Sequence, residues 1–425
     1  MQENRIFAKC AWRLIPFMML LYLVNYIDRV NVGFAALTMN RDLGFSPAVF
    51  GFGAGVLLIS YALFQVPANA MLQRLGARRW MALILLVWGA VSAACALVRD
   101  PLSFYALRFL LGAAEAGFFP GMIFYLTLWF PQTQRARFIA IFMSAAQLSF
   151  IVGGPLSSLI LQMDGASGLA GWQWLFLLEG LPACALAFAV LAWLPDGPAA
   201  ASWLSAGEKQ AIAKRLAAEE EAGHGHFWLA LRDPRVLALG VANFAYAAGH
   251  YGAQLWLPQI VREMGFSTLA TGFVVALPFA AAMAAMILWG HSSDRRRERV
   301  WHVALAMLLA AGGFLAASIV QSDLLMLLSL ACALIGIASG FGPFYSLPST
   351  FLGGAAAAAG IALVQTIGLM GGFVGSYVVG LLREATGNYS AAMAALGLGL
   401  VASALIVLAL GKAVAAKPAQ LRPGT

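Results

Sequence analysis

Residues 25–29 of the chain read Asn-Tyr-Ile-Asp-Arg, and they lie near the middle of a long apolar run. An acid and a base, Asp28 and Arg29, therefore stand side by side where about twenty apolar residues would cross a bilayer. A charge at that depth costs roughly 2.5–3.5 kcal/mol on insertion scales, so such residues face a bundle interior or a water-filled cavity. The stretch predicts a multi-helix membrane protein with a polar interior, which is typical of a carrier.

The composition supports an integral membrane protein. Of the 425 residues, 62% are hydrophobic and 10% are charged, and the mean hydropathy is +0.83. Soluble proteins average about 25% charged residues. The net charge of +8 comes from basic residues in short loops that lack stacking aromatic side chains, so the expected partner is a lipid bilayer and no nucleic acid.

Apolar runs of transmembrane length predict an all-α membrane fold with twelve spans. The spans are 13–36, 48–72, 79–98, 102–130, 136–161, 172–194, 235–261, 269–290, 299–320, 324–349, 357–383 and 390–411. The polar stretch 195–234 divides the chain into a six-helix bundle at 1–194 and a second six-helix bundle with its tail at 235–425. We expect this stretch to be a cytoplasmic linker containing a short amphipathic helix around Glu208 to Glu221.

The distribution of basic residues predicts the orientation. Twenty of the 26 Lys and Arg residues fall in the termini and loops on one side, while the loops of the other side hold four. Cytoplasmic loops carry the excess of Lys and Arg, so both termini are predicted to be cytoplasmic.

Cysteine and histidine spacing indicates no cofactor and no metal site. Cys10, Cys95, Cys184 and Cys332 are far apart and show no paired disulfide or zinc spacing. The pair formed by His224 and His226 supplies only two ligands, which is an incomplete metal site.

A weak internal repeat relates the two halves. Gln73-Arg74-Leu75-Gly76 follows the second span, and Asp294-Arg295 follows the eighth at the matching place. Two related six-helix halves are a transporter layout, with the substrate site near the midplane between them.

Three ordered motifs resemble one family over essentially the whole chain. They are NYIDR at 25–29, RFLLGAAEAGFFPG at 108–121 and WQWLFLLEG at 172–180. They are similar to the anion:cation symporter branch of the major facilitator superfamily, which includes bacterial carriers of sugar acids, tartrate, phthalate and hydroxyphenylacetate, and the animal sialin and vesicular glutamate transporters. This family usually has Gly and Asp where the chain has Asn69 and Gln73. That departure weakens the case for a gating salt bridge at position 73.

The resemblance implies a fold, an activity and a place in the cell. It implies two six-helix bundles with a central cavity between them, and secondary active, proton-coupled symport of an organic carboxylate by alternating access. The compact loops favour a bacterial inner membrane, and we expect a monomer with no cofactor beyond the coupling proton.

Four charges dominate the predicted N-terminal bundle. Arg108 and Glu115 are seven residues apart, so they lie about 20° apart on one helix face. Asp28 and Arg29 diverge by about 100°, so one can face a cavity while the other reaches a neighbouring helix. Because the four charges sum to zero, we expect a mutually paired cluster. A purely structural network is the alternative reading, since buried ion pairs are weak evidence for stability.

The functional reading is a coupling hypothesis. An anionic substrate that claims an arginine removes the positive neighbour of a carboxylate, which then takes up a proton. The loaded site is closer to neutral than a half-loaded one and passes more readily through an occluded state. In the resembled sugar-acid carriers, residues at the places of Asp28 and Glu115 are linked to protonation, and the residue at the place of Arg29 contacts the substrate.

Further substrate-binding residues are predicted in both halves. The resemblance implies that Tyr26, Tyr61 and Gln147 line the pocket from the N-terminal half, and Tyr345 and Gln365 from the C-terminal half. Arg108 joins Arg29 as a predicted substrate contact, or else orients the other charges. His250 is the only histidine deep in a span, and it either lines the cavity or is a core residue bonded to a carbonyl. Glu179 is expected to pair with a base in a loop, outside the site.

Two other function classes are weighed against symport. An enzyme would need a nucleophile with its base or a metal cluster, and the sequence shows neither pattern. A proton-coupled drug antiporter of the same fold is the alternative function, although a buried basic pair favours anions over cationic drugs. The residues leave open which carboxylate is carried and whether protons or sodium ions drive its transport.

Overall fold

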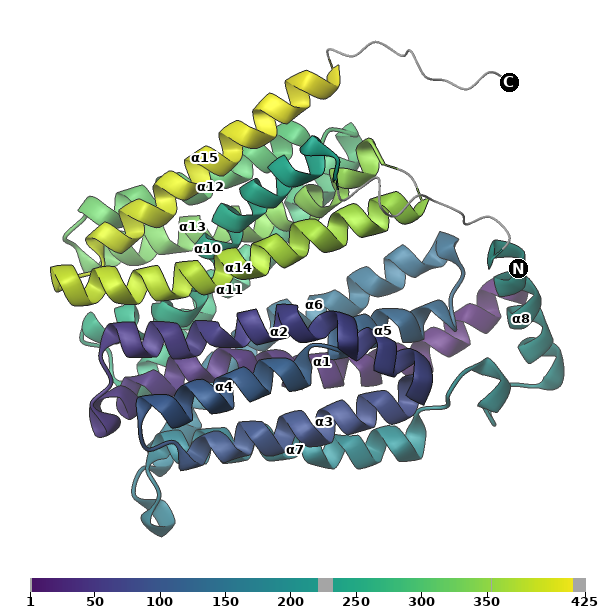
Figure 1. Cartoon of the computed structure of the whole chain (residues 1–425), viewed down its shortest axis with the longest axis horizontal. Coiled ribbons are helices and arrows are strands. Elements are labelled where there is room, and N and C mark those ends of the chain that lie inside the picture. Colours follow the sequence, from purple (N-terminus) through teal and green to yellow (C-terminus); the bar gives the residue numbers. More distant parts are fainter. Residues whose placement is uncertain (1, 221–231, 353, 416–425) are drawn as a thin grey trace. The chain divides into compact units, whose positions relative to one another are not determined.

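The computed structural model describes residues 2–220, 232–352 and 354–415 (Figure 1). Over these ranges the chain is helical and contains no strand. The predicted all-α membrane fold is confirmed, because eleven helical stretches among the described residues are long and apolar enough to cross a membrane. The remaining predicted span, 235–261, coincides with α10 (Pro234–Glu263), which is 30 residues long and carries Asn243, His250 and Gln254 along its length.

Within the described residues, the first half contains seven long helices, and the linker contributes a further helix. They are α1 (Gln2–Leu43), α2 (Pro47–Leu75), α3 (Ala77–Ala94), α4 (Pro101–Glu115), α5 (Phe118–Thr127), α6 (Gln132–Ile160), α7 (Gly171–Trp193) and α8 (Ala206–Glu220). The second half contains α10, α11 (Thr268–Arg296), α12 (Val300–Ile319), α13 (Asp323–Ser346), α14 (Gly354–Thr386) and α15 (Ser390–Ala415).

The predicted span 102–130 is interrupted rather than continuous. Helix α4 ends at Glu115 and α5 begins at Phe118. Pro120 lacks a backbone N–H, so the carbonyl of Ala116 cannot accept the helical hydrogen bond from four residues ahead. The break therefore falls directly after a buried carboxylate, and it ends the helix that carries this side chain.

The described residues form two compact units. Among the described residues, one unit comprises 2–220 together with Leu257–Ala276, and the other comprises 232–256, 277–352 and 354–415. In the first unit α1 packs on α6 and α7, α2 on α4, and α3 on α7 (Figure 1). In the second unit α12 packs on both α13 and α15.

Small residues bring the helices of the first unit close together. A Cβ added to Gly112 of α4 would lie 2.1 Å from the carbonyl oxygen of Leu57 in α2. One added to Gly180 of α7 would lie 2.7 Å from the backbone nitrogen of Ala93 in α3. Glycine at these positions lets backbones touch, which is how membrane helices pack without a hydrophobic driving force between them.

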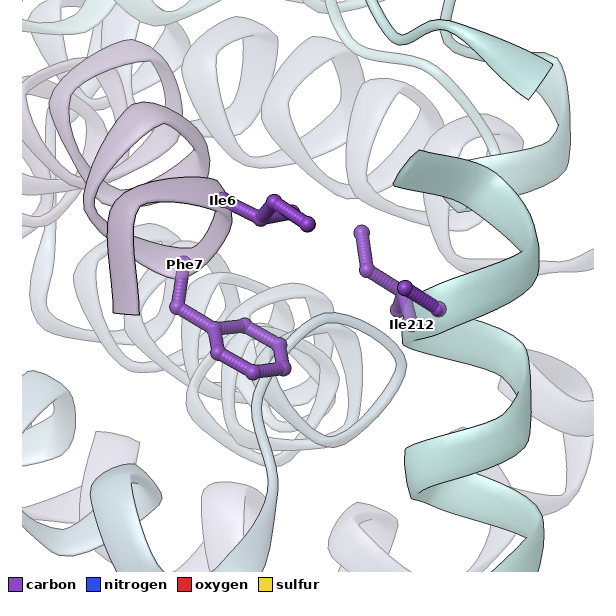
Figure 2. A pocket seen from close by; sticks show the side chains of 4 residues that line it. Ile6, Phe7 and Ile212 are labelled. Carbon is purple, nitrogen blue, oxygen red and sulfur yellow. The ribbon is translucent and has the colours of Figure 1, made fainter. Parts of the chain in front are cut away.

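The start of the linker lies against the first unit. Helix α8 begins with a capping box, in which the backbone N–H of Ser205 donates to Glu208 at 2.8 Å. Lys9 of α1 pairs with Glu208 at 2.9 Å. Figure 2 shows Ile6 of α1 and Ile212 of α8 extending toward each other in an apolar hollow. The helix α8 (Ala206–Glu220) lies where an amphipathic helix was expected, and it contacts the beginning of α1.

Candidate functional site

Two helices of the first unit, α1 and α4, supply the central charged residues. Asp28 and Arg29 lie in the middle of α1, Glu115 is the last residue of α4, and Arg108 lies two turns before it. Asp28 and Glu115 are fully buried, and Arg108 is 2% exposed. The Arg29 side chain retains 11% of its surface. Arg29 is therefore the most exposed of these four charges.

Arg29 and Glu115 form a direct ion pair between α1 and α4. The Nε–H of Arg29 donates to Oε2 of Glu115 at 2.7 Å. The other carboxylate oxygen, Oε1, is buried and accepts no hydrogen bond. Such a largely buried pair is a strong charge-assisted hydrogen bond, and it leaves one oxygen of Glu115 able to carry a proton.

Two tyrosines hold the guanidinium of Arg29 by their ring faces. The Cζ atom of Arg29 lies 5.4 Å from the ring centroid of Tyr26 and 4.8 Å from that of Tyr61. These distances are within the range of cation–π attraction. Tyr26 also packs edge-on against Tyr22, with ring centroids 4.9 Å apart. The guanidinium is thus fixed in place by α1, α2 and α4 together.

Asp28 points away from this pair, into a cage of neutral donors. Its carboxylate accepts hydrogen bonds from Asn31 Nδ2 at 2.9 Å, from Trp88 Nε1 at 2.6 Å and from the hydroxyl of Ser92. Trp88 and Ser92 both lie on α3, one turn apart. Three donors compensate much of the cost of burying a carboxylate without a direct cation.

Arg108 does not form the second ion pair that the sequence suggested. Its Nη2 donates to the carbonyl of Ala54 at 3.4 Å, while Nε and Nη1 are buried without a hydrogen-bond partner. The four charges still interact electrostatically. The expectation of a mutually paired cluster is therefore wrong in detail, because one acid uses neutral donors and one base contacts the backbone.

The remaining predicted site residues are distributed over both units. Gln147 lies half-buried on α6 of the first unit. In the second unit the Tyr345 hydroxyl accepts a hydrogen bond from Asn243 at 3.2 Å, and His250 packs edge-on against Tyr251 with ring centroids 5.1 Å apart. Gln365 is half-buried on α14. These residues are described within their own units, and their roles stay predictions.

Sequence reasoning missed the neutral partners of the charges. Asn31, Trp88 and Ser92 surround Asp28, and the signal for them was weak, namely single polar or amphipathic residues within apolar helices. Glu179 was assigned incorrectly to a loop base. It is 3% exposed on α7 and accepts a hydrogen bond from Ser157 of α6 at 2.8 Å.

The residues considered as metal ligands or disulfide partners form neither kind of site among the described residues. His224 and His226 lie outside the described residues. Cys10, Cys95, Cys184 and Cys332 are free thiols. Within the described ranges no group of three or more His, Cys, Asp or Glu side chains is placed to hold a metal ion.

Known proteins resemble the chain in sequence and in fold. A protein of Agrobacterium vitis named "Putative tartrate transporter" is 50% identical over 381 residues, which covers 89% of this chain and 88% of that protein. A "Quinolone resistance transporter" of Acinetobacter baumannii is 40% identical over 383 residues, covering 89% and 88%. The solved inward-facing structure of a bacterial homologue of the human lysosomal transporter Spinster superposes with a TM-score of 0.74 at 17% identity, covering 94% and 95%.

The family follows from these matches. The family model described as Major Facilitator Superfamily matches residues 18–376, which is most of the chain. The relatives are named as transporters, and a solved transporter structure shares the fold of this chain. This chain, with an arginine–glutamate pair buried among its membrane helices, therefore belongs to the Major Facilitator Superfamily and is a multi-pass membrane transporter rather than an enzyme.

Proposed function

We propose that the protein is a proton-coupled symporter of a small hydroxylated carboxylate such as tartrate. The observation that carries this proposal is the ion pair between Arg29 and Glu115, in which the only partly exposed charge of the site is a base held by an acid. The likeness to a tartrate-named relative supports a dicarboxylate with hydroxyl groups as the substrate.

The proposed cycle is a competition for Arg29. A substrate carboxylate binds the guanidinium and displaces Glu115, and a fully buried carboxylate that loses its cation is stabilised by taking up a proton. Oε1 of Glu115, which accepts no hydrogen bond, is the atom that receives this proton. Substrate binding separates Glu115 from Arg29, so that Glu115 takes up a proton. Protonation of Glu115 in turn releases Arg29 to the substrate, and the two therefore bind together.

The surrounding residues divide the remaining work. Tyr26 and Tyr61 hold the guanidinium in position while its carboxylate partner changes. Asp28 and Arg108 keep the buried charge near Glu115 balanced, so that one proton suffices for the transition. Gln147, His250, Tyr345 and Gln365 are proposed to contact the rest of the substrate. We place the protein in a bacterial inner membrane as a monomer, with both termini in the cytoplasm.

Uptake into proteoliposomes tests this proposal. Vesicles containing the purified protein are given tartrate, galactonate or phthalate under an imposed pH gradient, with and without a sodium gradient. We expect accumulation of tartrate with the pH gradient alone, and loss of tartrate binding in Arg29→Ala. Accumulation that needs sodium, or unchanged affinity in Arg29→Ala, would refute the assignment.

Drug efflux is the second candidate, and one observation favours it. A quinolone resistance transporter is 40% identical over nearly the whole chain. Quinolones carry a carboxylate and an aromatic ring system, which are groups that an arginine between two tyrosine rings can bind. Expression in a quinolone-sensitive bacterium decides between the two, since an exporter raises the inhibitory concentration and a tartrate importer does not.

A further inference from the structure

Glu179 is a buried carboxyl group that the proposed coupling does not use. It lies on α7, is 3% exposed, and receives one hydrogen bond, from Ser157 to Oε1. Its second oxygen, Oε2, is buried and accepts none. It forms no salt bridge within the described part of the chain. An ionised carboxylate with so few donors would be strongly destabilised in this place.

The environment of Asp28 is the opposite. That carboxylate accepts hydrogen bonds from three donors, which favour its ionised form, and the guanidinium of Arg108 acts on it electrostatically. The two carboxyl groups are therefore chemically distinct, although both are buried in the same unit.

Asn31 connects the two groups. Its Nδ2 donates to Asp28 at 2.9 Å, and its side chain also interacts with Glu179. Its Oδ1 is buried and receives no hydrogen bond. Helix α7 packs against α1, α3 and α6, and among the described charged groups on these helices the Asp28 carboxylate acts electrostatically on Glu179. An ionised Glu179 beside this amide would also repel the nearby Asp28 carboxylate, and its burial with a single hydroxyl donor gives little compensation.

We propose that Glu179 is a carboxylic acid throughout transport, and that its O–H donates to Asn31 Oδ1. The proton on Oε2 supplies the donor that Asn31 lacks, and the fixed amide then presents Nδ2 to the Asp28 carboxylate. Glu179 is thus a positioning residue for Asp28. The protonation of Glu179 does not depend on the proposed symport. Only the effect of Glu179 on uptake rests on that proposed function.

Infrared spectroscopy of the protein in lipid nanodiscs tests the protonation. We expect the spectrum to contain a protonated-carboxyl C=O band that persists from mildly acid to mildly alkaline pH and is missing in Glu179→Gln. If Glu179→Gln removes a carboxylate band instead, Glu179 is ionised and the proposal is overturned. This readout needs no transport activity, so it stands even if the proposed function fails.

Uptake measurements test the positioning role. Glutamine keeps both an acceptor for Ser157 and an N–H donor for Asn31, so Glu179→Gln is expected to retain wild-type uptake and an unchanged pH profile. Glu179→Ala leaves buried groups unpaired and is expected to lower uptake about tenfold. Glu208→Gln, the same chemical change in a half-buried residue of the linker helix, is the matched control. A pH profile in Glu179→Gln that shifts as in Glu115→Gln would mean that Glu179 exchanges its proton, and would overturn the proposal while leaving symport intact.

Discussion

Removing the charge of Glu115 should strengthen anion binding while abolishing proton coupling. In the wild type a substrate must displace Glu115 from Arg29, which breaks a charge-assisted hydrogen bond of 2.7 Å. Glu115→Gln keeps the shape of the side chain and removes the competing charge. Arg29 then has no Glu115 carboxylate for the substrate to displace, and position 115 no longer has a carboxyl group to take up the proton.

The size of the effect follows from the two kinds of hydrogen bond. A hydrogen bond to a charged group contributes about 1.5–3 kcal/mol, and one between neutral groups about 0.5–1.5 kcal/mol. Displacing residue 115 from Arg29 therefore costs the substrate about 1–1.5 kcal/mol less in the variant. With 11% and 0% of the two side chains exposed, solvent screening reduces this little. At 1.4 kcal/mol per tenfold, the affinity for tartrate should rise about fivefold to tenfold.

Binding and transport assays measure the two consequences separately. Isothermal titration with tartrate over a pH series should show tighter binding in Glu115→Gln and a loss of the wild-type pH dependence. Counterflow exchange should persist, whereas accumulation under a pH gradient should disappear. Glu208→Gln, the same chemical change on the linker helix, should behave as the wild type in both assays. Wild-type affinity together with pH-driven accumulation in Glu115→Gln would refute the competition for Arg29.

Three further outcomes are expected. Gly112→Ala places a carbon about 2.1 Å from a backbone oxygen of α2 and should destabilise the protein by about 1–3 kcal/mol, whereas Gly342→Ala, which meets nothing within 4 Å, should not change its melting temperature. Trp88→Phe removes one donor from the buried Asp28 carboxylate and should cost about 1.5–3 kcal/mol in denaturant unfolding. The pKa of Glu208 is held below its ordinary value of 4.5 by the backbone N–H that starts α8 and by a lysine of α1, so its stabilisation is present above pH 4.5 and is lost as pH falls through the lower folded value. Melting temperatures of the wild type and Glu208→Gln should therefore differ at neutral pH and converge in acid; a constant difference would contradict this.

The helices were predictable because their signal is long and local. Apolar runs of about twenty residues predict spans whatever their neighbours are, and a polar stretch of forty residues predicts the linker. The break after Glu115 could also have been derived, since Pro120 deprives the carbonyl four residues earlier of its donor. What the pattern could not supply was the exact length of α1, which continues beyond the predicted span at both ends.

The partners of the charged residues were less predictable because they depend on how helices meet. The period of 3.6 residues predicts that Arg108 and Glu115 share a face, but not that Arg29 pairs with one while the other contacts a backbone carbonyl. Two of the three donors to Asp28 lie on α3, about sixty residues along the chain. The positions of Trp88 and Ser92 depend on how α3 packs against α7. No residue spacing within a single helix encodes that packing.

In the proposed cycle the substrate anion binds Arg29, a proton binds Glu115, and the two cross the membrane together. The most direct measurement is proton flux driven by substrate alone. Proteoliposomes with a pH-sensitive dye inside and equal pH on both sides receive an inward tartrate gradient, with the membrane potential clamped. We expect tartrate entry through the wild-type protein to acidify the lumen, and no acidification with Glu115→Gln. Tartrate entry without acidification in the wild type would contradict this cycle.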